Sequence, residues 1–491
     1  MGRGRLNRRI VSLALASLLT GCSVGPDYVR PTVITPDAFR ETAGWKLARP
    51  QEDTIRGSWW EIFGDPELNA LEQRVSVSNQ GLAVAEANYR QARALVQEAR
   101  AAFFPTVTAG VGYRRFRASQ TAGSSSASGL ILNSGGSSGP ASDFALPLDV
   151  SWELDLWGRI RRSVESSKAG AQASAGDLET ALLSLQGELA QDYVQLRALD
   201  AQPQLLDATT AAFEKSLELT KNRYTSGVAS RADVAQAEAQ LKTTQAQAID
   251  LGVQRAQLEH AIAVLIGQPP SELSLAPAPL TSPPPAIPVG VPSELLERRP
   301  DIAAAERRVA AANAQIGVAV AAFYPTVTLS AAGGLESSSL AQWFMWPSRF
   351  WSVGPSISQT VFDGGLRRAQ TDQARAAYDA TVAVYRQTVL GAFQSVEDNL
   401  AALRILEDEA SVQDQAVQAA EESVALTTNQ YKAGIVSYLN VITAQTIALT
   451  NQTTAVQIRG RRVTAAVLLV EALGGGWNAA SLPSAASLKQ R

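Results

Sequence analysis

The chain contains very few of the residues that build reactive or cross-linked sites. Its 491 residues include one cysteine, one histidine and two methionines. A single cysteine excludes an intrachain disulfide framework, and a single histidine excludes a multi-histidine metal site. His260 lies in the segment LEHAIAVLIG and is interpreted as a surface or packing residue on a helix. We therefore expect no enzyme, no catalytic residues and no bound metal.

Long hydrophobic runs and net positive charge are also missing. After residue 22 no stretch approaches the roughly 18 uninterrupted apolar residues that indicate a membrane-spanning helix. The formal net charge is −3. An acidic balance argues against nucleic acid as a partner, because the phosphate backbone binds basic surfaces. Any crossing of a membrane would have to use strands.

The N-terminus has the pattern of a bacterial lipoprotein signal. Four arginines among the first nine residues precede an apolar run at 10–19 and the sequence LTGC. We predict that residues 1–21 are removed and that Cys22 carries lipid, the only modification or cofactor expected. Removal shifts the formal charge from −3 to −7. Ser23 permits anchoring in the outer membrane of a Gram-negative bacterium. An ordinary secretory signal with an incidental cysteine is the alternative.

Two segments of the chain occur twice. AAFFPTVT at 101–108 returns as AAFYPTVT at 321–328, and LTKNRYTSGVASRADV at 219–234 returns as LTTNQYKAGIVSYLNV at 426–441. The first pair is offset by 220 residues and the second by 207, so one tandem duplication with a 13-residue indel explains both. Each copy is predicted to run through a long helix, a β-hairpin, a very long helix, a tight turn and a helix.

The duplication sets the expected domain boundaries. The chain divides into a signal peptide (1–21), an N-terminal anchor segment (22–64), a first repeat (65–267) with its hairpin at 105–155, a Pro-rich linker (268–292), a second repeat (293–473) with its hairpin at 326–362, and a C-terminal tail (474–491).

The helical segments are much longer than those of a globular domain. Asp65 is the candidate N-cap of the first, with Pro66 at its first helical position, a possible interruption at 79–81 and a stop at Pro105. The segment 158–225 would span roughly 100 Å at 1.5 Å per residue. Its copy, 364–432, has Ala410 where the first has Pro203, so we predict a kink at Pro203. Periodicity alone also allows an isolated two-stranded coiled coil.

The hairpins alternate between apolar and polar residues. One face carries Val107, Ala109, Val111, Tyr113, Phe144, Leu146, Leu148, Val150, Trp152, Leu154, Trp351, Val353, Pro355 and Ile357. The other carries Thr106, Thr108, Gly110, Gly112, Asp149, Ser151, Glu153, Asp155, Ser352, Gly354, Ser356 and Ser358. Apolar residues outside and polar residues inside are typical of membrane barrel strands. A half-buried sheet in a soluble domain is the alternative, but the predicted neighbours are long helices that lead away.

The two hairpin loops differ in composition. Residues 114–143 are rich in serine and glycine, as expected of a flexible extracellular loop. Residues 336–349 include Trp343, Phe344 and Trp346, which suit the level of the lipid headgroups.

One chain cannot complete the predicted architecture. Four strands do not close, and an open sheet edge in lipid leaves backbone groups without partners. Two chains would give an eight-stranded barrel filled by side chains, whereas three would give twelve strands and an aqueous lumen. We therefore predict an α+β membrane protein. It would be a trimeric twelve-stranded β-barrel, with four strands per chain, continued by a long α-helical periplasmic barrel, and three copies are favoured over four.

Several motifs, in order along the mature chain, carry a family likeness. They are CSVGPDYVRP at 22–31, WWEIFGDPELNALEQRV at 59–75, the FPTVT and YPTVT junctions, LWGRIRR at 156–162 with its partner FDGGLRR, RRPDIAAAERR at 298–308 and ALGGGW at 472–477. Through them the chain resembles outer-membrane efflux factors of the TolC superfamily, in the lipoprotein (NodT/OprM-like) branch.

The resemblance implies a function and a set of partners. It implies a homotrimer in outer-membrane lipid that extends into the periplasm and docks to a periplasmic adaptor (membrane fusion) protein. It also implies an inner-membrane pump, usually of the resistance-nodulation-division class, that supplies the energy. The chain would then be a passive duct that exports drugs or other small amphiphiles.

The repeated pattern Tyr-x-x-Gly-x-x-Ser is typical of a helix end followed by a tight turn. It places Gly227 and Gly434 where a left-handed backbone is needed. By resemblance these turns form the periplasmic tip, where neighbouring helical hairpins close the tunnel. The tip tyrosine of the family matches Tyr431, and an aspartate of its first hairpin matches Asp233.

The same carry-over shows a departure from the family pattern. Two aspartates that ring the closed entrance in relatives fall at Asn440 and Thr443, so strong block by cations is not expected here. Tyr438 and Leu439 are expected to supply a steric closure instead. Arg231 completes the set of gating candidates. Ordinary solvated turn residues remain the alternative for all of them.

Two other functions stay open. A lipid-anchored structural or adaptor protein could bridge membranes without conducting, but it has no reason to present apolar strand faces to lipid. A duct for polypeptide secretion, paired with an ATP-driven transporter, is the other. Metal export finds no support in two methionines and one histidine.

Overall fold

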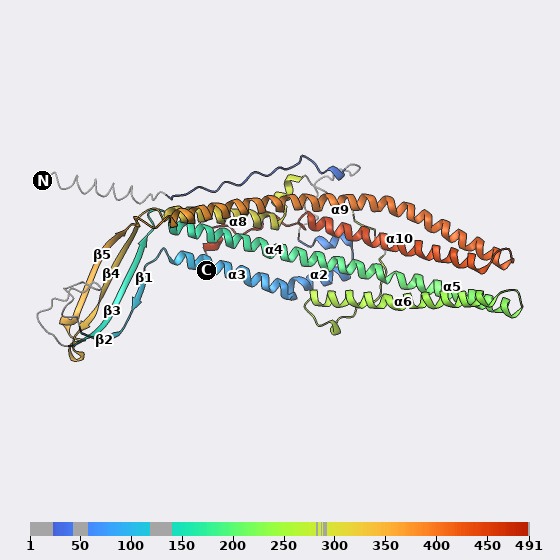
Figure 1. The fold of residues 1–491 in the computed structure, drawn as a ribbon, viewed down its shortest axis with the longest axis horizontal. Helices are drawn as coiled ribbons and strands as arrows, with labels where there is room; N and C mark the ends of the chain where they lie inside the picture. The colour runs from blue at the N-terminus through green and yellow to red at the C-terminus, as the bar shows by residue number, and fades with distance from the viewer. Residues whose placement is uncertain are drawn as a thin grey trace.

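The computed structural model of the protein describes residues 23–42, 57–117, 140–280, 283–285, 287 and 292–489. The chain is elongated, with a β-sheet at one end and the tips of two helical hairpins at the other (Figure 1). The predicted signal peptide, the predicted lipidation site Cys22 and residues 118–139 of the first hairpin loop lie outside the described residues.

The sheet is antiparallel and places the two hairpins side by side. Its strands are β1 (Thr106–Ala109), β2 (Gly112–Phe116), β3 (Ala141–Leu154), β4 (Thr326–Ser337) and β5 (Arg349–Ser358). β1 and β2 both pair with β3, β3 pairs with β4, and β4 pairs with β5. The first hairpin is thus joined to the second through β3 and β4.

β1 and β2 are two parts of one predicted strand. The register against β3 continues from Ala109 opposite Leu148 to Gly112 opposite Ala145. The gap lies opposite Pro147, which has no N–H to donate to the ladder. The four predicted strands are therefore present, and the first is interrupted by a residue on its neighbour.

The apolar face of the sheet is open. Val107 is opposite Val150, which is opposite Ala331, so the alternating apolar residues line up across strands. Trp351 is 80% exposed and Ile357 is 71% exposed. A half-buried sheet of a soluble domain would cover such side chains, and the helices instead lead away from the sheet (Figure 1).

The helices form two sets. The long ones are α2 (Pro66–Ser78), α3 (Gln80–Ala101), α4 (Arg159–Asp200), α5 (Gln202–Thr225), α6 (Arg231–Leu265), α8 (Pro300–Ala321), α9 (Leu366–Lys432) and α10 (Tyr438–Ala472), and α7 (Leu295–Arg298) is a single turn. Near the sheet, α3 packs against α4, α4 against α8 and α8 against α9. Farther away, α5 pairs with α6 and α9 with α10. Within the described ranges, no helix has the length and hydropathy of a membrane span.

The helix boundaries follow local side-chain chemistry. Asp65 caps α2 by accepting from the N–H groups of Glu67 and Leu68 at 2.9 and 3.2 Å. Asn79 ends α2 and caps α3 by accepting from Leu82 N–H at 3.0 Å. The predicted N-cap and the predicted interruption are both confirmed.

The break between α4 and α5 is a single residue. Pro203 cannot donate to the Leu199 carbonyl, which instead accepts from Ala201 N–H. Ala201 keeps right-handed angles, φ −79° and ψ −24°, so α5 continues the path of α4. α9 has no such residue and runs unbroken for 67 residues. The expected kink is thus a one-residue interruption two positions before Pro203.

Residues 23–42, named here the N-terminal strap, run along α8 and α9 (Figure 1). Val24 N–H donates to the Trp157 carbonyl at 3.1 Å, so the strap begins where the sheet meets α4. Near its other end, the Glu397 carboxylate accepts from the N–H groups of Arg40 and Glu41 at 2.7 and 3.0 Å. The strap therefore connects the sheet junction to the middle of the helical body.

Candidate functional site

The two predicted tip turns lie together at the end of the molecule farthest from the sheet (Figure 1). Gly227 and Gly434 have φ values of 74° and 76°, which only glycine adopts readily. Their N–H groups donate to the carbonyls of Tyr224 and Tyr431 at 2.9 and 3.0 Å. The glycines thus end α5 and α9 and allow each hairpin to reverse.

A small apolar core, named here the tip cluster, joins the two hairpins. The rings of Tyr431 and Tyr438 lie 5.4 Å apart at 53°. The buried members come from α5, α6, α9 and α10: Phe213, Leu217, Val234, Ala237, Leu241, Tyr431, Tyr438 and Val441. Tyr431 is therefore a packing residue between hairpins within one chain.

Arg223 fastens the end of α9 to α5. Its Nη1 donates to the Tyr431 carbonyl at 2.7 Å, and its Cζ lies 4.6 Å from the centre of the Tyr431 ring. A charge-assisted hydrogen bond and a cation–π contact thus act on one residue. Thr220, which is fully buried, adds a 3.3 Å contact to the Tyr431 hydroxyl. Sequence reasoning missed Arg223, although its counterpart in the second copy is the neutral Gln430.

Asp233 acts within its own turn. Its carboxylate accepts from the N–H and the hydroxyl of Ser230, each at 2.9 Å, and its N–H donates to Ser230 Oγ at 3.1 Å. This capping box begins α6. At the matching position of the second copy, Asn440 follows Ser437, which makes no side-chain cap. Arg231, at the first position of α6, is exposed.

The other gating candidates divide between the surface and the core. Asn440 and Thr443 are exposed on the first turns of α10, and Thr443 Oγ1 donates to the Leu439 carbonyl at 2.9 Å. Leu439 is 52% exposed, but Tyr438 is only 1% exposed. The ring of Tyr438 is therefore buried in the tip cluster by residues of both hairpins and does not lie at the surface, where a steric closure was expected. Leu439 alone of that pair faces outward.

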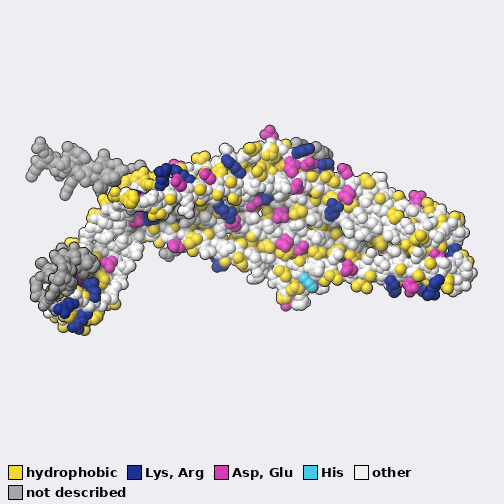
Figure 2. All heavy atoms as spheres, viewed as in Figure 1, with side chains coloured by type: hydrophobic (Ala, Val, Ile, Leu, Met, Phe, Trp, Pro, Cys, Tyr) yellow, Lys and Arg dark blue, Asp and Glu magenta, His cyan; other side chains and the backbone are white. Residues whose placement is uncertain are grey.

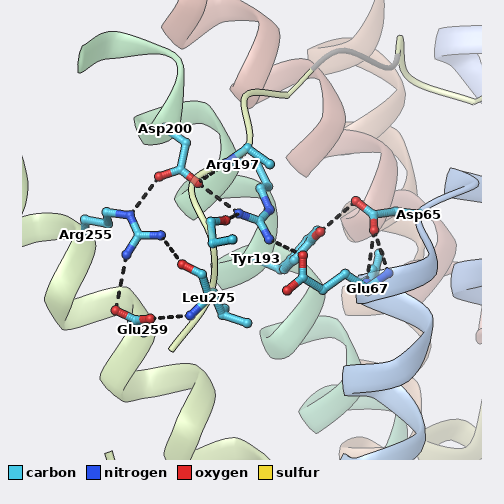
Figure 3. A network of polar contacts seen from close by, with 11 residues as sticks. Asp65, Glu67, Tyr193, Arg197, Asp200, Arg255, Glu259 and Leu275 are labelled. Atoms are coloured by element: carbon cyan, nitrogen blue, oxygen red, sulfur yellow. Dashed lines mark hydrogen bonds and ion pairs between the residues drawn. The ribbon is translucent and has the colours of Figure 1, made fainter. Parts of the chain in front are cut away.

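A network of polar contacts, named here the junction network, lies where α4 ends (Figure 3). Arg197 donates to Asp200 at 2.9 Å, to Glu67 on α2 at 2.5 Å and to the Ala276 carbonyl at 2.7 Å. Its side chain is 3% exposed and that of Asp200 is 1% exposed. Buried charges of this kind persist only when they are paired and hydrogen-bonded.

Arg255 extends the network to α6 and to the linker. It donates to Asp200 Oδ1 at 2.8 Å, to Glu259 at 3.2 Å and to the Leu275 carbonyl at 2.6 Å. Figure 3 shows Asp200 between the two arginines. The network therefore holds α2, α4, α6 and the linker together directly before the break at Ala201.

Tyr193 and Asp65 complete the α2 side of the network. The Tyr193 hydroxyl donates to Asp65 Oδ2 at 2.7 Å, and burial raises the pKa of Tyr193. The carboxylate that caps α2 is thus also the acceptor that fixes α2 to α4.

Glu72 is a buried acid on α2. It is 0% exposed, and neither carboxyl oxygen has a hydrogen-bond partner among the described residues. Burial raises the pKa of Glu72 to about 9. The side chain is therefore a neutral carboxylic acid at pH 7. Asp192 on α4 is a milder case, because burial and then the nearby Glu188 raise its pKa to about 6.

The described residues contain few side chains that could form a reactive centre. They contain no group of three His, Cys, Asp or Glu side chains that could hold a metal ion. His260 lies on α6 and is exposed, in agreement with its interpretation as a surface residue. The tip cluster and the junction network hold helices in place.

Known proteins match this arrangement over nearly the whole chain. A family model described as outer membrane efflux protein matches residues 71–268 and 291–475. The pyoverdine export outer membrane protein OpmQ of Pseudomonas aeruginosa is 32% identical over 474 residues, covering 96% of this chain and 98% of its own. The toluene efflux pump outer membrane protein TtgF of Pseudomonas putida is 33% identical, covering 95% and 97%. Among solved structures, the outer-membrane channel OprN matches with a TM-score of 0.84 at 33% identity, covering 93% of this chain and 100% of that chain.

Proposed function

The chain belongs to the outer membrane efflux protein family, and from that premise we propose that it is the outer-membrane channel of a tripartite efflux system. It acts in the outer membrane as a passive duct, and an inner-membrane pump delivers the cargo. The observation that carries the proposal is the exposed apolar face of the sheet, set at one end of a long helical body. A structural bridge between membranes has no use for that face.

Three copies would close the sheet and the helical body. Within one chain the edges β1/β2 and β5 have no strand beside them among the described residues. Pairing β5 of one copy with β1/β2 of the next gives twelve strands, enough to enclose a lumen. The helices α3 and α9 flank the body in the same way. In a homotrimer, the open edges of the sheet and of the helical body would both pair with the next copy.

Cys22 is the proposed lipidation site. Ser23, its neighbour in sequence, packs against Gly158 at the junction of the sheet and α4, where an added Cβ on Gly158 would lie 3.0 Å from Ser23 Cα. A lipid on the preceding residue would then enter the membrane at the level where the helices begin. The N-terminal strap fixes this position along the body.

The proposed partners are a periplasmic adaptor and an inner-membrane pump of the resistance-nodulation-division class. We propose drugs or other small amphiphiles as cargo. The similar identities to a pyoverdine exporter and a toluene efflux protein indicate that whole-chain similarity does not select the cargo. Cargo selection is therefore assigned to the pump.

The tip cluster is the proposed gate. Arg223 and Tyr431 hold the two hairpins of each chain together, so separating them would widen the periplasmic entrance. Asp233 supports the gate by capping α6, and Gly227 and Gly434 shape the turns. Arg231, Asn440 and Thr443 lie on the exposed surface, available to a neighbouring copy or an adaptor.

Single-channel recording in planar bilayers tests the proposal. Full-length wild type should show small, rarely open currents, and Arg223→Gln, which installs the second copy's residue, should raise the open probability. Lys221→Gln is the matched control, because it removes an exposed cation two residues before Arg223 on the same helix. An Arg223→Gln variant that inserts and stays as closed as wild type would refute the gate. Failure of every form to conduct after confirmed insertion would refute the duct and favour the structural bridge.

A further inference from the structure

The free end of the sheet carries arginines on its apolar face. Figure 2 shows a gathering of basic side chains at this end of the sheet. We name the group the outer rim. Its basic members are Arg115 and Arg349, and its aromatic members are Tyr113, Trp343, Trp346 and Trp351.

Strand register places both arginines on the face that would meet lipid. Tyr113 is opposite Phe144, with ring centres 4.7 Å apart, and Arg115 lies two residues farther along the same strand. Arg349 is opposite Leu335, which is opposite Leu146. Since residues two apart share a face, Arg115 and Arg349 belong to the apolar side at the two edges of the sheet.

The acids of the sheet lie on its other face. Asp143 pairs with Arg114 at 3.4 Å, and Glu336 is opposite Ala145, so all three are on the polar side. The apolar face of the described strands contains no aspartate or glutamate. Within the described residues, Arg115 and Arg349 form no ion pair, and both are exposed. Their charge is therefore uncompensated by this chain's strands.

The guanidinium group of Arg349 lies over the ring of Trp346 in a position that could bind an anion. Its Cζ lies 3.5 Å from the centre of the Trp346 ring, and Trp346 is 75% exposed. Stacking occupies the flat face of a guanidinium and leaves the N–H groups at its edge free to bind phosphate oxygens. The Trp343 ring contacts Phe144 of β3, with ring centres 5.8 Å apart and an interplanar angle of 45°.

The opposite end of the sheet is built differently. There Arg159 donates to Glu153 at 2.9 and 2.7 Å, and Arg367 donates to Asp363 at 2.5 Å. These arginines are neutralised where the sheet meets the helices. Uncompensated arginine on the apolar face is thus a property of the end that points away from the helical body.

We propose that the outer rim binds the phosphate groups of a phosphorylated glycolipid in the outer leaflet of the membrane. The proposal rests on the proposed function, because it needs the sheet in the outer membrane with its free end outward. Acyl chains would cover the exposed apolar residues below the rim, such as Val353, and the arginines would meet the phosphates above them. In a closed trimer, each junction between copies would bring the β5 edge with Arg349 beside the β2 edge with Arg115.

Lipid binding to the purified full-length protein tests this inference. Native mass spectrometry in detergent would count bound diphosphorylated lipid A on wild type, on Arg115→Gln/Arg349→Gln and on Arg114→Gln. The Arg114 variant is the matched control, because it removes the adjacent arginine from the polar face. We expect the double variant to lose about tenfold in affinity, equal to about 1.4 kcal/mol, and the control to bind as wild type.

Two further measurements make the result decisive. Wild type with dephosphorylated lipid A tests the phosphate without changing the protein, and it should show the same loss. Equal binding of the dephosphorylated lipid, or equal binding of phosphatidylglycerol, would overturn the proposal. Insertion into phospholipid vesicles without glycolipid is measured first on the same preparation. Failure to insert contradicts the proposed function, whereas insertion without a preference for lipid A contradicts only this inference.

Discussion

Arg223 on α5 donates to the main-chain carbonyl of Tyr431 on α9 at 2.7 Å and covers the ring of the same residue. Two residues that are 208 positions apart thus fasten the hairpins of one chain at their tips. Because the bond uses a backbone acceptor, no substitution of Tyr431 removes it directly. The Arg223 side chain therefore supplies both contacts.

The two partners should therefore differ in their effect on gating. Arg223→Gln removes the cation from both contacts, whereas Tyr431→Phe removes only the 3.3 Å contact to Thr220. A charge-assisted hydrogen bond contributes about 1.5–3 kcal/mol, so we expect Arg223→Gln to raise the open probability by about tenfold or more and Tyr431→Phe by less. Single-channel recording of both variants gives the ranking. A larger effect from Tyr431→Phe would show that the hydroxyl is the main fastener.

Asn440 and Thr443 predict how the entrance responds to cations. Both are neutral and exposed, so a multivalent cation added to the periplasmic side should leave wild-type currents unchanged. In the proposed trimer, Asn440→Asp/Thr443→Asp would place six carboxylates around the entrance and should create a block that weakens with salt. Asn440→Gln/Thr443→Ser is the neutral control. Block of wild type at the same cation concentration would contradict this account.

Glu72 predicts a pH dependence of stability. Its pKa is about 9 in the folded chain against an ordinary value of 4.5. Between these values the folded chain holds a proton that the unfolded chain releases, so stability falls as pH rises through this window, by up to about 1.4 kcal/mol per pH unit. Glu72→Gln should remove this slope from melting curves recorded between pH 5 and 9. The control Glu86→Gln, at an exposed position, should retain the pH dependence of stability. A wild type whose stability does not change with pH would contradict the raised pKa of Glu72.

Removing Arg197 of the junction network should lower the unfolding free energy more than removing an exposed arginine. Arg197→Ala leaves buried carboxylates without their cation and should cost about 3–5 kcal/mol in unfolding free energy. Arg308→Ala breaks an exposed pair with Asp177, in which both side chains are 48% exposed, and should cost at most about 1 kcal/mol. Apparent melting temperatures of the two variants in one detergent check the order. Equal melting temperatures would mean that the network contributes little to stability.

The N-terminal strap depends on a close backbone approach at Gly25. This residue has φ +96°, and an added Cβ would lie 2.5 Å from Gly317 Cα. Gly25→Ala should release the start of the strap and speed chymotryptic cleavage after Tyr28, by about tenfold for a loss of docking of about 1.4 kcal/mol. Ile34→Ala, at a position of the strap that is 90% exposed, is the control. Unchanged cleavage would show that the strap docks without this contact.

Sequence reasoning succeeded where neighbours along the chain decide the structure. Asp65 and Asn79 cap helices through bonds that span two or three residues, and Pro203 interrupts its helix through its own missing N–H. Period-two alternation placed the strand faces in the same way. The interruption of the first strand was not foreseen, because its cause, Pro147, lies on the opposite strand.

The polar sites could not be predicted because distant segments build them. Arg197 bonds to Glu67 across 130 positions, and Arg255 bonds to Asp200 across 55. Nothing in the local pattern of either arginine separates it from a solvated one. The burial of Tyr438 could not be predicted for the same reason, because α5 and α6 of the neighbouring hairpin contribute most of the tip cluster around its ring.

The unbroken path of α9 gives the two hairpins different mechanical properties. A rod of 67 residues, roughly 100 Å long at 1.5 Å per residue, moves its far end by about 5 Å when it tilts by about 3° at its base. The α4–α5 path is interrupted at Ala201, next to Asp200 of the junction network, so we expect it to bend at this residue more readily than α9 bends anywhere along its length. Widening at the tip by several ångströms would therefore require only a small rotation at the base of α9, and the interruption at Ala201 would determine how much of that rotation reaches the hairpin of α5 and α6.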